Sequence, residues 1–129
     1  MNRRALLAAP LALAATPALA SGGGGGSSTS TFFRYPTVTA NTFTSDGRRG
    51  VMTVETGVDI ADPALLLRAQ QSAPRVRAVF NILVQREAAT LLPGQPPNVD
   101  RLSRQFQSAM NIILRQRGAR LLIGTVMVV

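Results

Sequence analysis

The hydrophobic pattern of the chain changes its period at Asp62-Pro63, from that of strands to that of helices. Before this dipeptide, one set of residues alternates with more polar neighbours: Met52, Val54, Thr56, Val58 and Ile60. A period of two predicts a strand with one buried and one wet face. After the dipeptide, apolar residues recur every three or four positions, which is the spacing of amphipathic helices. Because an N-cap acid followed by proline favours a helix start, strands are predicted before this point and helices after it.

Two more features belong to the predicted strand region. Threonine and β-branched residues predict a strand over Thr37–Phe43, and Asp46-Gly47 within Ser45–Arg48 predicts a tight turn leading into the next strand. The aromatic residues Phe32, Phe33 and Tyr35 precede this hairpin, and we interpret them as a packing anchor.

Three helices are predicted after the change of period. The first covers Ala64–Gln71, and Ser72-Ala73-Pro74 ends it and starts the second. The apolar stripe of the second helix comprises Val76, Val79, Phe80, Leu83, Val84 and Ala88. A loop over Leu92–Pro97 leads to a third helix, capped by Asn98 or Asp100 and stopped at Gly118. Its predicted inward face comprises Leu102, Phe106, Ala109, Met110 and Ile113.

The last predicted element is the apolar run Leu121–Val129. Such a run is typical of a strand buried on both faces, so we expect it at the centre of the sheet. The predicted fold is therefore α+β, a small, mainly antiparallel sheet with about three helices packed on one face, in the order β-β-α-α-α-β.

Residues 1–20 have the three parts of a secretory signal peptide. Arg3 and Arg4 precede a short apolar run, and Ala18-Leu19-Ala20 predicts cleavage after Ala20. The segment resembles a twin-arginine signal, and ordinary Sec export fits equally well. Either route predicts a periplasmic protein, or a membrane-anchored one if the signal is not cleaved.

The next segment, 21–31, contains only glycine, serine and threonine and is predicted to be a disordered linker before a single domain over 32–129. Its five glycines do not fit a phosphate-binding loop, because no strand is predicted before them and the chain has no lysine to reach a phosphate.

Composition argues against an enzyme. The chain contains no cysteine, histidine or lysine, which removes the usual nucleophiles, bases and metal ligands, and its six acidic residues are scattered. Asp59 and Asp62 come closest to a carboxylate pair, and roles at a strand end and as a helix cap explain them. We therefore expect no catalytic residue, cofactor or metal site.

All 14 basic residues are arginines, and removal of Arg3 and Arg4 would leave twelve against six acids, a net charge of +6. Four arginines on the outward faces of the predicted helices form the predicted interaction surface: Arg75, Arg77, Arg101 and Arg104. An exported protein is not expected to meet nucleic acid, so the candidate partners are envelope proteins, anionic lipid or lipopolysaccharide. A solvated basic surface without a dedicated partner remains the alternative.

Between Tyr35 and Val129 the chain resembles the periplasmic domain of the FliL family of flagellar basal-body-associated proteins. The resemblance rests on the alternating strand Val51–Asp59, the helical segment "APRVRAVFNILVQREAATLL" and the terminal "GARLLIGTVMVV". The positions that match the family pattern in the helical segment are Pro74, Val76, Arg77, Val79 and Leu83.

The resemblance implies a non-enzymatic scaffold that associates with the flagellar stator or basal body, with a stomatin-like fold that assembles into rings. The family keeps an uncleaved transmembrane helix, whereas this chain carries a predicted cleavable signal. Two other functions stay open: a small envelope protein that binds anionic lipid or lipopolysaccharide, and a carrier of a small ligand between sheet and helices.

Overall fold

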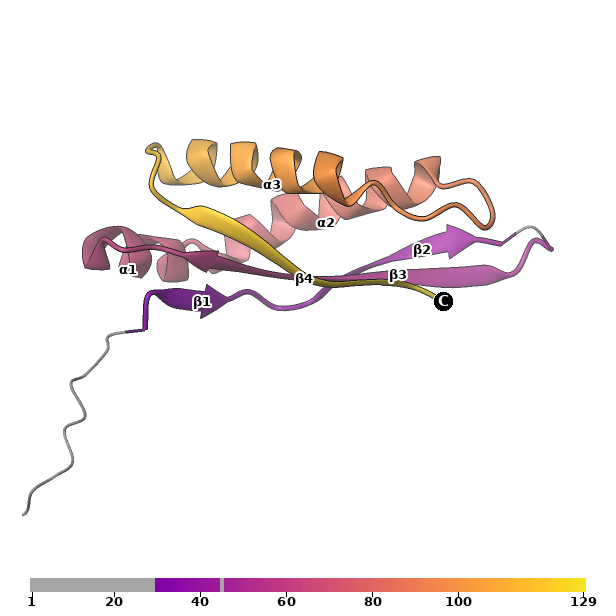
Figure 1. Cartoon of the computed structure of the whole chain (residues 1–129), viewed down its shortest axis with the longest axis horizontal. Coiled ribbons are helices and arrows are strands. Elements are labelled where there is room, and N and C mark those ends of the chain that lie inside the picture. The colour runs from indigo at the N-terminus through magenta and orange to yellow at the C-terminus, as the bar shows by residue number, and fades with distance from the viewer. Residues whose placement is uncertain (1–29, 45) are drawn as a thin grey trace, which may run out of the picture.

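The computed structural model describes residues 30–44 and 46–129. Within these residues the elements are β1 (Phe32–Arg34), β2 (Val38–Phe43), β3 (Arg49–Asp59), α1 (Pro63–Gln71), α2 (Ala73–Thr90), α3 (Val99–Leu114) and β4 (Arg120–Val128) (Figure 1). The predicted signal segment 1–20, with Ala18 and Ala20, lies outside the described residues, as do residues 21–29 of the predicted linker and Ser45.

The α+β class and the antiparallel sheet are confirmed, with one strand more than predicted. The additional strand is β1, which changes the order to β-β-β-α-α-α-β. Its three residues are too few to show a period in the sequence. Phe32 packs its ring on the backbone of Gly57, where a Cβ atom would lie 2.6 Å from the ring. Strand β1 is thus held by its aromatic residues, as the predicted packing anchor implied.

The centre of the sheet is β3. Strands β1 and β2 follow one another along one edge of β3, and β4 pairs with the other edge. All of these pairings are antiparallel. Every residue of the predicted inward set, from Met52 to Ile60, is buried, so the period of two identified the correct face of this strand.

The position predicted for the terminal run is wrong. Strand β4 pairs only with β3 among the described residues, so it is an edge strand and not a central one. Of its nine residues only Leu121 is buried. Burial on both faces therefore does not explain why this run is apolar.

Helices α2 and α3 lie side by side over one face of the sheet, and α1 lies at one end and contacts both (Figure 1). Two predicted caps are confirmed: Asp62 accepts a hydrogen bond from the Ala64 N–H at 3.0 Å, and Asn98 accepts one from the Arg101 N–H at 2.9 Å. The predicted stop at Gly118 is wrong, because α3 ends at Leu114 and Arg115 adopts the left-handed conformation that closes the helix, with φ 56°.

The core fills the layer between the sheet and the helices. Phe80 of α2 stacks on Phe106 of α3 with ring centroids 4.3 Å apart, and the Tyr35 ring meets Phe80 edge-on at 6.1 Å. All three side chains are buried. Aromatic pairs in these geometries add to the stabilisation that burial itself provides.

Tyr35 makes the core sensitive to alkali. Its hydroxyl donates a hydrogen bond to the Ala69 carbonyl at 3.1 Å, and burial raises the pKa of Tyr35 from 10.0 to about 12. The folded state therefore favours the neutral phenol. This stabilisation is complete below the unfolded pKa and is lost as the pH rises through the folded pKa.

We expect the phenolate absorbance of the folded protein to titrate with a midpoint near pH 12, and near pH 10 in denaturant. The signal is specific, because Tyr35 is the only tyrosine and the chain has no tryptophan, cysteine or lysine. Tyr35→Phe should show a free energy of unfolding that changes less between pH 10 and 12. A midpoint near pH 10 in the folded protein would contradict this assignment.

Candidate interaction surface

The four arginines of the predicted interaction surface are all exposed, but they do not form one patch. Arg104 lines a shallow groove between α2 and α3 together with Val79. Arg75, one helical turn before Val79, lies on the same side of α2. Arg77 is two residues before Val79 and therefore points about 200° away around the helix.

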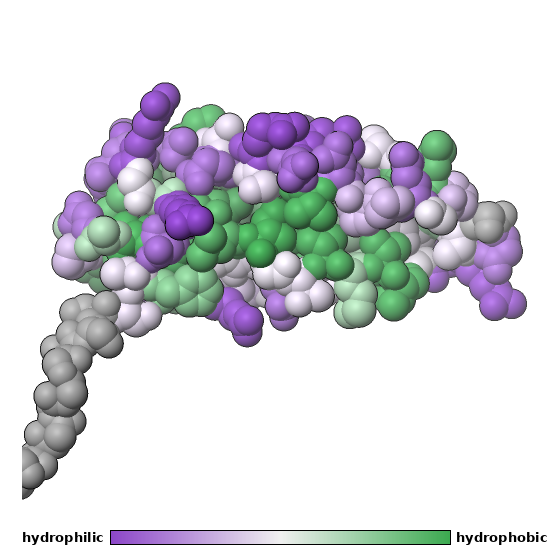
Figure 2. All heavy atoms as spheres, in the orientation of Figure 1, coloured by the Kyte–Doolittle hydropathy of each residue, from purple (hydrophilic) through white to green (hydrophobic). Residues whose placement is uncertain are grey.

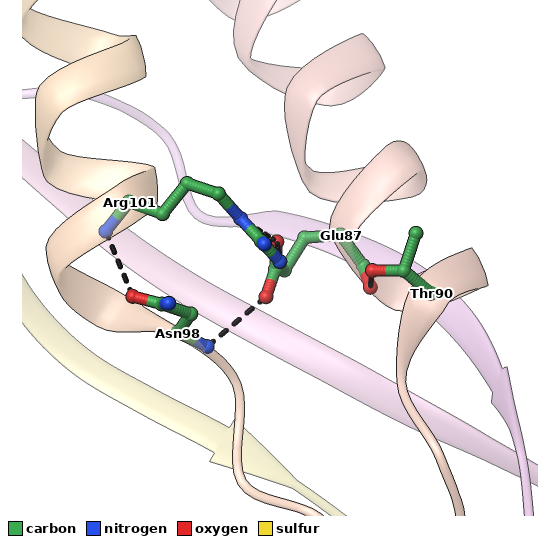
Figure 3. Close-up of polar contacts among 4 residues, drawn as sticks. All are labelled: Glu87, Thr90, Asn98 and Arg101. Carbon is green, nitrogen blue, oxygen red and sulfur yellow. Dashed lines mark hydrogen bonds and ion pairs between the residues drawn. The ribbon is translucent and has the colours of Figure 1, made fainter.

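The fourth arginine, Arg101, is part of an ion pair between the two helices (Figure 3). The Glu87 carboxylate accepts hydrogen bonds from Arg101 Nε at 3.1 Å, from Arg101 Nη2 at 2.6 Å and from the Asn98 backbone N–H at 3.0 Å. The Glu87 side chain is 4% exposed, whereas that of Arg101 is 46% exposed. Arg101 thus satisfies a buried charge and joins the end of α2 to the start of α3.

The sequence contains a signal for this pair that the prediction missed. Glu87 lies three residues after Val84 and seven after Phe80, in the apolar stripe of α2. A carboxylate at such a position is expected to be buried and to need a cationic partner.

Arg75 and Arg104 remain as the two predicted arginines that can share one surface.

Three other acidic residues, Asp46, Asp59 and Asp62, lie where the sequence placed them. Asp62 caps α1, and Asp59 is in β3 opposite Arg120 of β4. Asp46 accepts hydrogen bonds from the Thr44 hydroxyl and the Arg48 N–H in the β2–β3 turn, and these bonds lower the pKa of Asp46. Asp46 and Asp62 thus form local hydrogen bonds with residues of their own turn or helix start.

Metal-binding clusters and membrane-spanning helices are both absent from the described part of the chain. Within it, no three acidic side chains come close enough together to hold a metal ion. Also within residues 30–44 and 46–129, no helix combines the length and the hydropathy that a membrane crossing requires.

A hollow of about 540 Å³ lies at one end of the sheet. Its walls are mostly apolar and come from the end of β2, the loop between α2 and α3 and the end of β4; they include Phe43, Leu92, Pro96 and Val129. The volume is in the range of small-molecule sites, but the convergent polar groups of such sites are represented only by threonine and glutamine side chains.

An exposed apolar surface follows β4. Figure 2 shows a hydrophobic band between the polar outer side of the helices and the lower rim of the sheet, in the position that β4 occupies in Figure 1. Met127 and Val128 are 48% and 41% exposed. Contiguous apolar surface of this kind is typical of protein–protein contact sites.

One side chain covers the start of this edge. Gln107 of α3 donates a hydrogen bond from Nε2 to the Ala119 carbonyl at 2.7 Å and accepts one at Oε1 from the Leu121 N–H at 2.9 Å. Its amide makes the two hydrogen bonds that a neighbouring strand would otherwise make with these backbone groups. The rest of the edge has no such cover among the hydrogen bonds of the described residues.

We expect Gln107→Ala to lower the free energy of unfolding by about 1 to 2 kcal/mol, because two backbone groups lose their partner. The exchange rate of the Leu121 amide should rise at the same time. Gln105→Ala, on the same helix and with an exposed side chain, should change stability by less than about 0.5 kcal/mol. Equal effects of the two substitutions would contradict the role of Gln107.

Comparison with known proteins assigns no family to this arrangement. No protein-family model matches the chain, and no curated protein matches it either.

Proposed function

We propose that this chain is a non-enzymatic interaction protein of the bacterial envelope, similar to the FliL periplasmic domain, which acts by binding a protein partner or a second copy of itself. The observation that carries the proposal is the outer edge of β4, a mostly exposed apolar strand whose outer side no described strand pairs with beyond Leu121. Partners in the flagellar stator or basal body are those that the FliL resemblance suggests.

Two observations support binding over catalysis. The chain has no histidine, cysteine or lysine with which to activate its hydroxyl groups. The layer between helices and sheet is filled by large side chains such as Phe80, Phe106 and Met110, all of them buried. A carrier that encloses its ligand between sheet and helices would need that space.

One observation favours a second candidate, a protein that binds a small apolar ligand. The hollow at the end of the sheet is large enough for one, and Phe43, Leu92 and Val129 provide apolar walls. Leu92→Asp in the apolar wall of the hollow should weaken binding of such a ligand while the β4 edge stays intact.

Export is tested by producing the full chain in a Gram-negative host and determining the N-terminus of the mature protein. We expect the mature chain to begin at Ser21 and to be released with the periplasmic contents. An uncut chain in the membrane fraction would support the anchored alternative, and an uncut cytosolic chain would contradict an envelope function.

The type of partner is tested by charge reversal. Arg75→Glu combined with Arg104→Glu changes the groove side of the helices, and Arg77→Glu serves as control on the other side of α2. If lipid or lipopolysaccharide is the partner, the double variant should lose binding to anionic vesicles. If the partner is a protein at the β4 edge, cross-linking in the envelope fraction should survive both variants.

A further inference from the structure

The outer edge of β4 presents unpaired backbone groups. Val51 and Val129 exchange two hydrogen bonds, at 2.9 and 3.0 Å. Because hydrogen-bonded pairs alternate along an antiparallel ladder, Met127, Leu122 and Arg120 also direct their backbone groups at β3. The N–H and C=O groups of Leu121, Ile123, Val126 and Val128 therefore point away from β3.

The contacts of Gln107 support this direction independently. The Leu121 N–H is bonded to the Gln107 side chain, so it does not face β3. The outward groups from Ile123 to Val128 remain open. Long apolar edge strands without charge or proline are sites of strand pairing, and Arg120 at the start is the only charged residue of β4.

The regular alternation of side chains along β4 is interrupted by a β-bulge. Val126 is paired with Val54, but Ile123 with Thr56, so Gly124 and Thr125 together oppose Glu55 in a bulge. The helix-facing residues are consequently Leu121, Ile123, Val126 and Val128, and Ile123 and Val126 are three positions apart where a regular strand would have two. A regular strand added to this edge would repeat the mismatch that β3 already has with β4.

We propose that the occupant of this edge is a second copy of the chain, paired β4 to β4 in antiparallel orientation, with paired residue numbers that add to 249. Leu121 then lies opposite Val128 of the second copy, and Ile123 opposite its Val126. Outward backbone groups of the two copies face each other, except that the Leu121 N–H opposite the Val128 C=O is already bonded to Gln107. Helix-facing side chains meet helix-facing side chains, and the two bulges lie opposite each other.

Charge agrees with this register. Arg120 lies opposite Val129 of the second copy, so the pairing opposes no like charges along the strands. The arrangement has a two-fold axis between Gly124 and Thr125 and closes as a dimer with one continuous sheet. Gln107 already holds the Leu121 N–H, so pairing is strongest from Ile123 to Val126.

The test uses the full chain and a pair of cysteines in a protein that has none. In the proposed register Leu122 and Met127 of the two copies form non-hydrogen-bonded pairs, with Cα atoms about 4.5 Å apart, which suits a disulfide. Within one copy they are about 16 Å apart and cannot be bridged. We expect Leu122→Cys with Met127→Cys to give a covalent dimer on mild oxidation.

Controls identify the register and the edge. Leu122→Cys with Val129→Cys pairs only if the register slips by two residues, so it should stay uncrosslinked. Val126→Pro removes an outward N–H but no bond to β3, and should raise the dimer dissociation constant in sedimentation by about tenfold or more. Circular dichroism checks that this variant folds, and the cysteine variants test the proposal independently of it.

Three results would overturn the proposal: a monomer at the highest soluble concentration, a dimer that the 122/127 pair fails to cross-link, or a monomer that instead binds a strand of another protein at this edge. The inference rests on the proposed function only in treating the chain as an interaction protein. A monomer that is exported and captures an envelope protein would reject the dimer alone, and a β4-paired dimer that stays in the cytosol would reject the envelope function alone.

Discussion

Phe80→Ala is expected to lower the free energy of unfolding by about 3 to 5 kcal/mol. The Phe80 side chain is fully buried, stacks on Phe106 and receives the edge of Tyr35, so its removal leaves a cavity bordered by both rings. Small domains are stable by about 5 to 15 kcal/mol, so the variant should be close to unfolding. Urea denaturation at one fixed protein concentration measures the difference, because association would raise the apparent stability.

The matched control for Phe80 is Ile112→Ala on α3. Ile112 is 76% exposed, and its truncation should change the free energy of unfolding by less than about 0.5 kcal/mol. A loss of less than about 1 kcal/mol in Phe80→Ala would mean that the aromatic stack between α2 and α3 does not carry the core.

Arg101→Ala is the second large effect, with an expected loss of about 3 kcal/mol. The Glu87 side chain is 4% exposed in the native structure, and the substitution leaves it only the Asn98 N–H as a partner from this cluster. Breaking a buried pair costs more than the pair contributes, because the charge that remains has lost its compensation. The effect should appear as a lower urea midpoint at neutral pH.

Arg104→Ala provides the comparison, since this arginine is one turn further along α3 and makes no ion pair among the described residues. It should change stability by less than about 0.5 kcal/mol. Glu87→Leu combined with Arg101→Met should recover most of the loss, because no charge is then left buried. Equal losses in Arg101→Ala and Arg104→Ala would show that Arg101 is a surface residue after all.

The sequence was sufficient for every element except β1 and for the buried apolar residues of β3, α2 and α3. Period two in β3 and the three- and four-residue spacing in α2 and α3 follow directly from which side of each element is dry. Asp62 and Asn98 placed two helix starts because a side-chain oxygen must satisfy the first free N–H groups. These are local effects, so local patterns predict them.

The position of β4 could not be predicted in this way. An apolar run indicates low contact with water, but it does not tell whether a second strand of the same chain or of another copy provides the cover. The bulge at Gly124 and Thr125 arises from the pairing with β3, a contact between distant segments. The contact between Glu87 and Arg101 could not be predicted either, because it depends on how the turn between α2 and α3 places the two helices.

The β4 edge is tested most directly by amide hydrogen exchange resolved for single residues and followed over protein concentration. Ile123, Val126 and Val128 have outward N–H groups, whereas those of Leu122 and Met127 face β3. We expect the outward amides to exchange rapidly in dilute protein and to become protected as concentration rises, while Leu122 and Met127 stay protected throughout. Outward amides that exchange rapidly at every concentration would contradict pairing of β4 with a second copy.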